Sequence, residues 1–131
     1  MKRNKEERQL TKAEMEIMNV LWSAPSPQEG LTTHEIIEHY PDPKPAYSTI
    51  ATFLKILTNK EFISSRKQEG GGKTFVFFPL LTREEYTNRV MKEVKSTFFA
   101  GSLKSMLSFF AQQEEVSEEE LKDIVAMINK S

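Results

Sequence analysis

In this sequence of 131 residues, four hydroxyl residues that precede a helical pattern of apolar residues are each followed by a glutamate three positions later. In this pattern the hydroxyl oxygen accepts a hydrogen bond from the first turn of a helix, and the glutamate carboxylate accepts one from the backbone N–H of the hydroxyl residue. The pattern predicts that helices begin at four places, which any fold for this chain has to accommodate. The pairs are Thr11/Glu14, Thr32/Glu35, Thr82/Glu85 and Ser117/Glu120.

Prolines divide the first part of the chain into three helical segments. Apolar residues recur at helical spacing from Leu10 to Trp22, before the first prolines. A short helix after Thr32 ends at Pro41, because proline lacks a backbone N–H and disfavours the helical conformation in the residue before it. A third helix is expected over residues 46–60. Its apolar arc contains Ile50, Phe53, Leu54 and Leu57, and the opposite arc contains Ser48, Thr52, Lys55 and Asn59.

The periodicity then changes from helix to strand. Residues 62–66 and 74–78 are rich in aromatic and β-branched side chains, and three consecutive glycines, Gly70 to Gly72, lie between them. This pattern predicts a β-hairpin with a flexible, basic tip. Three helices followed by a two-stranded hairpin is the order of a winged helix-turn-helix. We therefore expect a mostly helical fold with a small hairpin, in which residues 1–80 form a DNA-binding domain.

Residues 81–131 are predicted to form three further helices, since they contain no proline and no strand pattern. Their apolar side chains recur at steps of three and four, but three short helices cannot bury such wide apolar faces by themselves. We expect a second copy of the chain to cover these faces, so that the region dimerises. The expected interface residues are Val90, Val94, Phe98, Leu103, Leu107, Phe110, Leu121, Ile124 and Ile128.

Composition excludes several classes of chemistry. The chain has no cysteine, which removes thiolate metal sites, thiol catalysis and disulfides. His34 and His39 are five positions apart and do not share a helix face, so we expect surface side chains rather than metal ligands. The patterns of a catalytic triad and of a cofactor-binding loop are also missing. We expect no enzymatic activity, no metal and no cofactor.

Membrane insertion is not expected either. The longest apolar runs contain only a few residues, far fewer than the roughly 20 that span a bilayer. The basic residues at the start of the sequence are not followed by the apolar stretch of a secretory signal. We therefore expect a soluble, cytoplasmic protein.

The formal net charge of −1 hides a basic segment. Between positions 44 and 73, six basic side chains outnumber Glu61 and Glu69, and a local basic patch is what phosphate binding requires. The six are Lys44, Lys55, Lys60, Arg66, Lys67 and Lys73. Hydroxyl and lysine side chains on the third helix suit base edges and phosphates in the major groove, and the basic hairpin suits the phosphate backbone. The expected DNA-binding residues are Lys44, Ser48, Thr52, Lys55, Arg66, Lys67 and Lys73.

Three blocks of the sequence, residues 10–22, 46–60 and 77–86, resemble the penicillinase and methicillin-resistance repressor family, in the same order along the chain. The resemblance implies a winged-helix repressor that binds palindromic operators of resistance or stress genes as a homodimer. It also implies that the C-terminal helices form the dimerisation region. It also implies a sensor-linked protease as a partner in induction. By position in the motif, the operator-reading helix would present Tyr47, Ser48, Thr49 and Thr52, with Lys73 in the wing.

The sequence departs from this family's pattern at several points. Family members often carry an arginine where this sequence has Ile56 and a glycine where it has Glu61. In the β-lactam branch, induction is associated with proteolysis at an Asn-Phe bond, and this sequence contains no Asn-Phe pair. The copper-responsive branch carries a cysteine motif, so the absence of cysteine excludes copper sensing through thiolates.

The sequence leaves two functions from different classes open. The first is a homodimeric, sequence-specific DNA-binding repressor acting on a palindromic operator. The second is a winged helix that serves as a protein adaptor and binds no DNA, which the near-zero net charge favours. They differ in salt dependence, since affinity for DNA falls steeply as salt rises.

Overall fold

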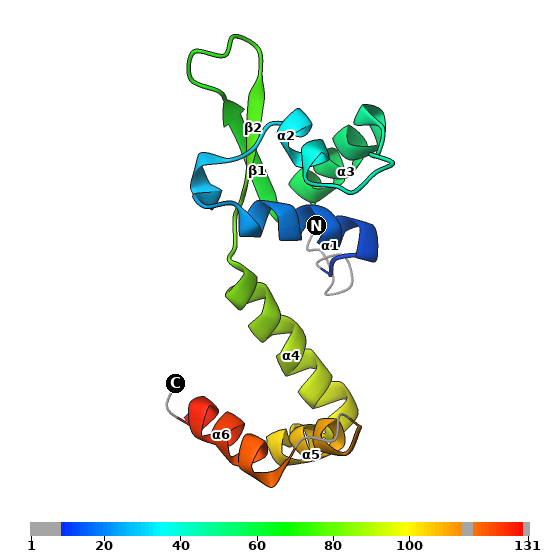
Figure 1. The fold of residues 1–131 in the computed structure, drawn as a ribbon, viewed down its shortest axis with the longest axis vertical. Coiled ribbons are helices and arrows are strands. Elements are labelled where there is room, and N and C mark those ends of the chain that lie inside the picture. The colour runs from blue at the N-terminus through cyan, green and yellow to red at the C-terminus, as the bar shows by residue number, and fades with distance from the viewer. Residues whose placement is uncertain (1–8, 114–116, 130–131) are drawn as a thin grey trace. The chain divides into compact units, whose positions relative to one another are not determined.

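The described part of the chain, residues 9–113 and 117–129 of a computed structural model, contains six α-helices, one short 3₁₀ helix and a two-stranded antiparallel sheet (Figure 1). In chain order the elements are α1 (Lys12–Ser23), η2 (Pro27–Glu29), α2 (Thr33–Glu38), α3 (Tyr47–Asn59), β1 (Ile63–Lys67), β2 (Phe75–Pro79), α4 (Arg83–Phe99), α5 (Leu103–Gln113) and α6 (Glu118–Asn129). The predicted winged-helix fold, mostly helical with a small hairpin, is confirmed.

The hydroxyl–glutamate pairs start helices as predicted. Both reciprocal hydrogen bonds are present at Thr11/Glu14 before α1, at Thr32/Glu35 before α2 and at Thr82/Glu85 before α4. Ahead of α6, the Ser117 hydroxyl accepts a hydrogen bond of 3.1 Å from the Glu120 N–H. Each box satisfies backbone N–H groups that have no partner inside the helix.

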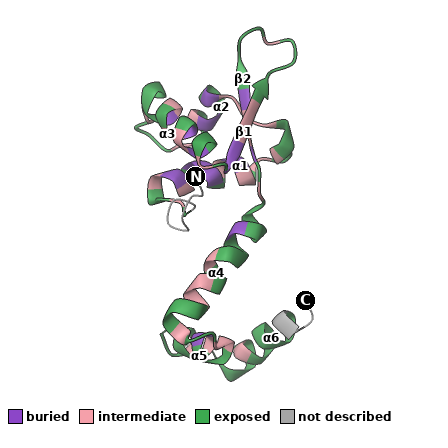
Figure 2. Cartoon of the chain, turned by 180° about the vertical axis from the view of Figure 1, so that it is seen from behind, coloured by how far each residue is buried: buried purple, intermediate pink, exposed green. Residues whose placement is uncertain are grey.

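Two compact units make up the chain, Met1–Glu85 and Tyr86–Ser131. In the first, α1, α2, α3 and both strands all contain buried residues, which form the core of this unit (Figure 2). Phe53, predicted on the apolar arc of α3, is only half-buried. The core residues are Ile17, Met18, Leu21, Ile36, Ile50, Leu54, Leu57, Phe62, Ile63 and Val76.

The hairpin forms one residue later in the chain than the aromatic runs predict. Ile63 pairs with Pro79 at one end of the ladder and Lys67 pairs with Phe75 at the other. Leu31 adds a single pair on β2, where it exchanges backbone hydrogen bonds of 2.8 and 2.9 Å with Phe77. A single residue pair leaves no alternating pattern in a sequence, so this contact was not predicted.

Glycine is required beside this pair. Gly30 has a φ of 78°, and a Cβ atom there would lie 2.9 Å from the Phe77 carbonyl oxygen. Any other residue would be strained both by its backbone angle and by this close approach. Gly30 therefore allows the segment before α2 to pair with the wing.

A single left-handed residue connects α3 to β1. Glu61 has a φ of 68°, its N–H donates to the Thr58 carbonyl, and the Phe62 N–H donates to the Leu57 carbonyl. These two bonds form a Schellman motif, in which glycine usually occupies the left-handed position. The glycine that the resembling family often carries here is replaced by a residue with a Cβ atom, which has a conformational cost.

The second unit buries few of its apolar side chains. Tyr86 and Met106 are buried, whereas Phe98 is 74% exposed. Within the unit, the ring of Phe109 lies 5.7 Å from that of Phe99 and 5.6 Å from that of Phe110. Among the described residues, no helix is both long enough and apolar enough to cross a membrane.

Candidate nucleic-acid interface

Helix α3 has one buried face and one polar, exposed face. Ile50, Leu54 and Leu57 point into the core and are at most 2% exposed. The predicted contact residues Tyr47, Ser48, Thr49, Thr52 and Lys55 are all exposed. Helix α3 therefore presents hydroxyl groups and one ammonium group to solvent along its length.

The Thr52 side chain is already oriented by a hydrogen bond. Its hydroxyl donates to the Ser48 carbonyl oxygen over 2.8 Å. With its proton engaged, the hydroxyl oxygen can still accept a hydrogen bond, and the methyl group remains available for apolar contact. In a major groove such a side chain suits the amino groups of adenine and cytosine, or the methyl group of thymine.

The exposed end of α3 also contacts α2. Tyr47, the first residue of α3, is 53% exposed, and its ring lies 5.0 Å from the ring of His34, with the two planes tilted by 42°. His34 belongs to the first turn of α2 and is exposed as well. The two rings form a small aromatic surface where the two helices meet.

The wing is the loop between β1 and β2, which extends away from helices α1 to α3 (Figure 1). Its base is closed by a hydrogen bond of 2.7 Å from the Gln68 N–H to the Thr74 carbonyl. Gly70 and Gly72 both have positive φ, and a Cβ atom at either would meet nothing within 4 Å. Lys67, the last residue of β1, and Lys73, within the loop, are both exposed.

Two of the predicted DNA-binding side chains are engaged within the protein. The Arg66 guanidinium donates to the Glu29 carbonyl over 2.8 Å and lies 4.9 Å from the centre of the Phe78 ring. The Lys44 ammonium donates to the Tyr40 and Glu38 carbonyls over 2.6 and 3.2 Å. Both remain exposed, but part of their hydrogen-bonding capacity is used internally.

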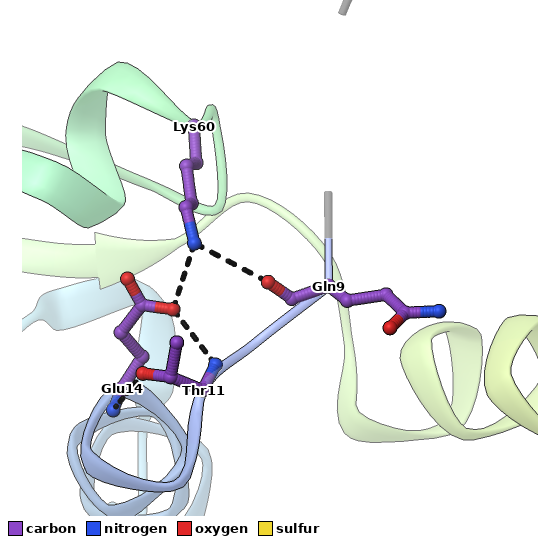
Figure 3. Close-up of polar contacts among 4 residues, drawn as sticks. All are labelled: Gln9, Thr11, Glu14 and Lys60. Carbon is purple, nitrogen blue, oxygen red and sulfur yellow. Dashed lines mark hydrogen bonds and ion pairs between the residues drawn. The ribbon is translucent and has the colours of Figure 1, made fainter. Parts of the chain in front are cut away.

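Lys60 is engaged with Glu14 and Gln9, so it does not contribute a free positive charge to the basic patch (Figure 3). Its ammonium lies 2.9 Å from the carboxylate of Glu14 and donates to the Gln9 carbonyl, with only 20% of the side chain exposed. The same carboxylate accepts the Thr11 N–H of the α1 capping box. Of the six basic side chains between positions 44 and 73, only Lys55, Lys67 and Lys73 make no side-chain hydrogen bond or ion pair with the described residues.

The protonation of Glu14 is determined by opposing effects. Burial by itself would raise the pKa of this carboxyl, but hydrogen bonds from the Thr11 backbone and from Lys60, with the charge of Lys60, hold the pKa below its ordinary value of 4.5. Glu14 is therefore a buried residue of α1 whose carboxyl group favours the ionised form. Sequence reasoning assigned it to a capping box but missed the ion pair, because the two charges are 46 positions apart.

The predicted interface residues of the second unit are partly exposed in the single chain. Val90, Val94, Leu103, Leu107 and Leu121 are half-buried, and Phe98, Phe110 and Ile124 are exposed. The side chain of Ile128 lies outside the described residues. His34, His39 and the acidic residues of the described segments form no cluster of three metal-ligating groups.

Comparisons with known proteins agree with this arrangement. A family model described as penicillinase repressor matches residues 10–130. The penicillinase repressor of Bacillus licheniformis is 26% identical over 123 residues, which cover 93% of this chain and 91% of the relative. The methicillin resistance regulatory protein MecI of Staphylococcus aureus strain N315 is 24% identical over 123 residues, with 93% and 94% covered. The penicillinase repressor of Staphylococcus aureus is 26% identical over 126 residues, with the same coverage.

Proposed function

The chain belongs to the penicillinase repressor family, and from this we propose that it is a transcriptional repressor that binds a palindromic operator as a homodimer. The names of its relatives, penicillinase repressor and methicillin resistance regulatory protein, support resistance genes as the class that it regulates. Repression needs no enzymatic activity, because a bound dimer excludes polymerase from the promoter sterically. We do not include cleavage at an Asn-Phe bond, since the sequence has none.

The observation that carries this proposal is the polar outer face of α3. The face presents Ser48, Thr49 and Thr52, and the opposite face packs Ile50, Leu54 and Leu57 into the core, so the helix can enter a major groove without exposing these core side chains. Lys55 on the helix, Lys67 at the end of β1 and Lys73 in the wing loop would contact phosphates. In a dimer, two such helices would read half-sites about one helical turn apart, roughly 34 Å.

The exposed apolar side chains of the second unit support the proposal of a homodimer. Phe98, Phe110 and Ile124 are exposed in the single chain, and a second copy would remove them from water. Dimerisation also doubles the number of phosphate contacts. Three unengaged lysines per chain give about six contacts per dimer, for which affinity should fall roughly 10³-fold between about 50 and about 200 mM salt.

A gel-shift titration with the DNA upstream of its own gene tests the function. We expect a discrete shift that random duplex does not compete away and that weakens steeply with salt. No shift at micromolar protein would contradict the proposal and favour the adaptor, the second function considered, whose partner would be another protein.

Thr52→Ala tests base reading. If Thr52 contacts a base, the substitution weakens operator binding by about 1 to 3 kcal/mol and leaves binding to random duplex unchanged. Thr87→Ala, an exposed threonine on α4, is the matched control and should change neither. Equal losses on operator and random duplex would contradict the assignment of Thr52 to a base.

Lys73→Ala tests the wing. Because a phosphate contact carries no sequence information, we expect operator and random duplex to lose affinity alike, with the salt slope smaller by about one unit for each phosphate that is no longer neutralised. Lys92→Ala on α4 is the control for removal of one exposed positive charge. A Lys73 variant with the original salt slope would remove the wing from the interface.

A further inference from the structure

We infer that His34 is a further DNA-contact residue, which with Tyr47 extends the interface onto α2 and makes operator binding stronger as pH falls. This inference rests on the proposed function. The observation behind it is the ring contact of 5.0 Å between two exposed aromatic side chains, one on each helix of the helix-turn-helix.

The position of the pair points to the phosphate backbone. In helix-turn-helix proteins, the reading helix directs its N-terminal residues at the bases, and the helix before it crosses the backbone. Tyr47 is the first residue of α3, and His34 is the α2 side chain in contact with it. His34 therefore lies where the path of the phosphates crosses from α2 to α3. It also packs against the Tyr47 ring, which is 53% exposed.

The chemistry of imidazole supplies the pH dependence. Histidine is the side chain whose charge ordinarily changes between about pH 5 and 8, and only its protonated form offers a positive charge with two N–H donors. A phosphate beside the ring favours the protonated form, so binding takes up a proton. Because binding takes up a proton, affinity for DNA should rise as pH falls.

The charged groups around His34 do not cancel this effect. On α2, Glu35 accepts the Thr32 N–H, and Glu38 lies one turn further along the helix. The first turn of α3 contributes the Tyr47 phenol and no acidic residue. In the loop between α2 and α3, the Lys44 ammonium lies 4.0 Å from the Asp42 carboxylate, so the charge of Asp42 is partly balanced by that of Lys44.

The sequence makes the inference easy to test, because the chain has only two histidines and no cysteine. His39 is the internal control, since its Nδ1 lies 2.8 Å from the Glu35 carbonyl at the end of α2 and it has no contact with Tyr47 among the described interactions. The terminal α-amino group also titrates near this range, but every variant retains it.

The experiment measures binding of the full-length protein to its operator duplex at about pH 5.5 and about pH 8, over a series of salt concentrations. For the wild type we expect affinity about tenfold higher at the lower pH. We also expect a salt slope that is steeper there by about 0.9 for each His34, because one more counterion is released per contact. His39→Gln should keep both responses.

Two substitutions separate the charge of His34 from its ring. His34→Phe keeps an aromatic partner for Tyr47 but cannot be protonated, so it should lose the tenfold gain in affinity and the steeper salt slope that the wild type shows at the lower pH. His34→Ala should lose the pH response and also bind more weakly than His34→Phe, because Tyr47 loses its ring partner. Circular dichroism and thermal melting establish that each variant is folded.

The two kinds of failure are distinguishable. A wild-type protein that binds its operator equally at both pH values, or a His34→Phe variant that keeps the pH response, would overturn the inference and leave the proposed function intact. Loss of the response in His39→Gln alone would do the same. Absence of operator binding at both pH values would overturn the function and the inference together.

Discussion

The two units of this chain contain similar helices but bury their apolar side chains very differently. In the first unit, three helices and a hairpin enclose side chains such as Ile17, Leu54 and Phe62, all at most 2% exposed. In the second, three helices of 17, 11 and 12 residues leave Phe98, Phe110 and other large apolar side chains exposed in the single chain. The hairpin makes the difference, because its strands cover the side of the helices that would otherwise face solvent. Helices without such a layer need a partner to complete their core.

The polar contacts differ in the same way. In the first unit they join distant parts of the sequence, as in the hydrogen bond of 2.9 Å from Trp22 to the Leu81 carbonyl and the ion pair between Glu14 and Lys60. The hydrogen bonds at Ser102 and Ser117 in the second unit each join residues three positions apart. The first unit is therefore held together in part by polar contacts between distant segments, whereas these hydrogen bonds of the second unit are local.

The sharpest test of this contrast is Phe98→Asp, for which we expect the largest effect. Phe98 is 74% exposed in the single chain, so the substitution costs little there, but it would place a charge in the proposed dimer interface. We expect the dissociation constant of the dimer to rise about 100-fold, or about 3 kcal/mol. Sedimentation over a dilution series measures it.

Leu80→Asp is the matched control from the first unit, because Leu80 is also a large apolar side chain, 53% exposed. It should leave the dimer unchanged. Equal behaviour of the two variants would erase the distinction between the units and argue against dimerisation through the C-terminal helices.

Glu14→Gln tests the opposite side of the comparison, the self-contained first unit. Glutamine can still cap α1, but it leaves the largely buried Lys60 ammonium without its negative partner. We expect a loss of about 2 kcal/mol in the free energy of unfolding, independent of protein concentration. Glu35→Gln is the control, because it makes the same change in the exposed capping box of α2 and should cost well under 1 kcal/mol.

The same carboxylate predicts a dependence on pH. Because the pKa of Glu14 in the folded protein is held below 4.5, its ionised form favours folding. This contribution is present above about pH 4.5 and is lost as pH falls through the lower, folded value. Urea unfolding of wild type and Glu14→Gln should therefore converge in strongly acidic solution, and a constant difference down to that range would contradict the assignment.

The smallest effect is expected from Glu61→Gly, which should stabilise the first unit. Glycine removes the cost of a Cβ atom at a φ of 68°, a gain of about 1 kcal/mol. Glu61→Ala removes the same charge but keeps the Cβ atom, so it should show no such gain. If both variants change stability equally, the backbone conformation of residue 61 is not the cause.

Local patterns in the sequence were sufficient to predict most of the helices and the hairpin. Capping pairs such as Thr32/Glu35 give helix starts, and the change from helical to alternating periodicity after Phe62 gives the hairpin. The bridge between Leu31 and Phe77 could not be predicted, because it involves one residue on each side and depends on Gly30 approaching a carbonyl group. Contacts between distant residues leave no periodic signal.

The candidate site was predictable to a similar extent. The face of α3 that carries Ser48, Thr52 and Lys55 follows from helical spacing alone, and the structure places these residues on one exposed helix. Counting charges in the basic segment was less accurate. Lys60 forms an ion pair with the buried Glu14, and Arg66 donates a hydrogen bond to the Glu29 carbonyl. Glu14 and Glu29 both lie far from these residues in the sequence.

The internal engagement of Lys44, Lys60 and Arg66 also bears on how this protein would search a chromosome. Millions of random sites compete for any cationic protein, and each additional phosphate contact makes that competition stronger. Of these three, Lys60 has its charge paired with a largely buried carboxylate, so under the proposed function it would add little to the attraction for random sequence. Lys44 and Arg66 donate to neutral carbonyl groups and keep their charge at the surface.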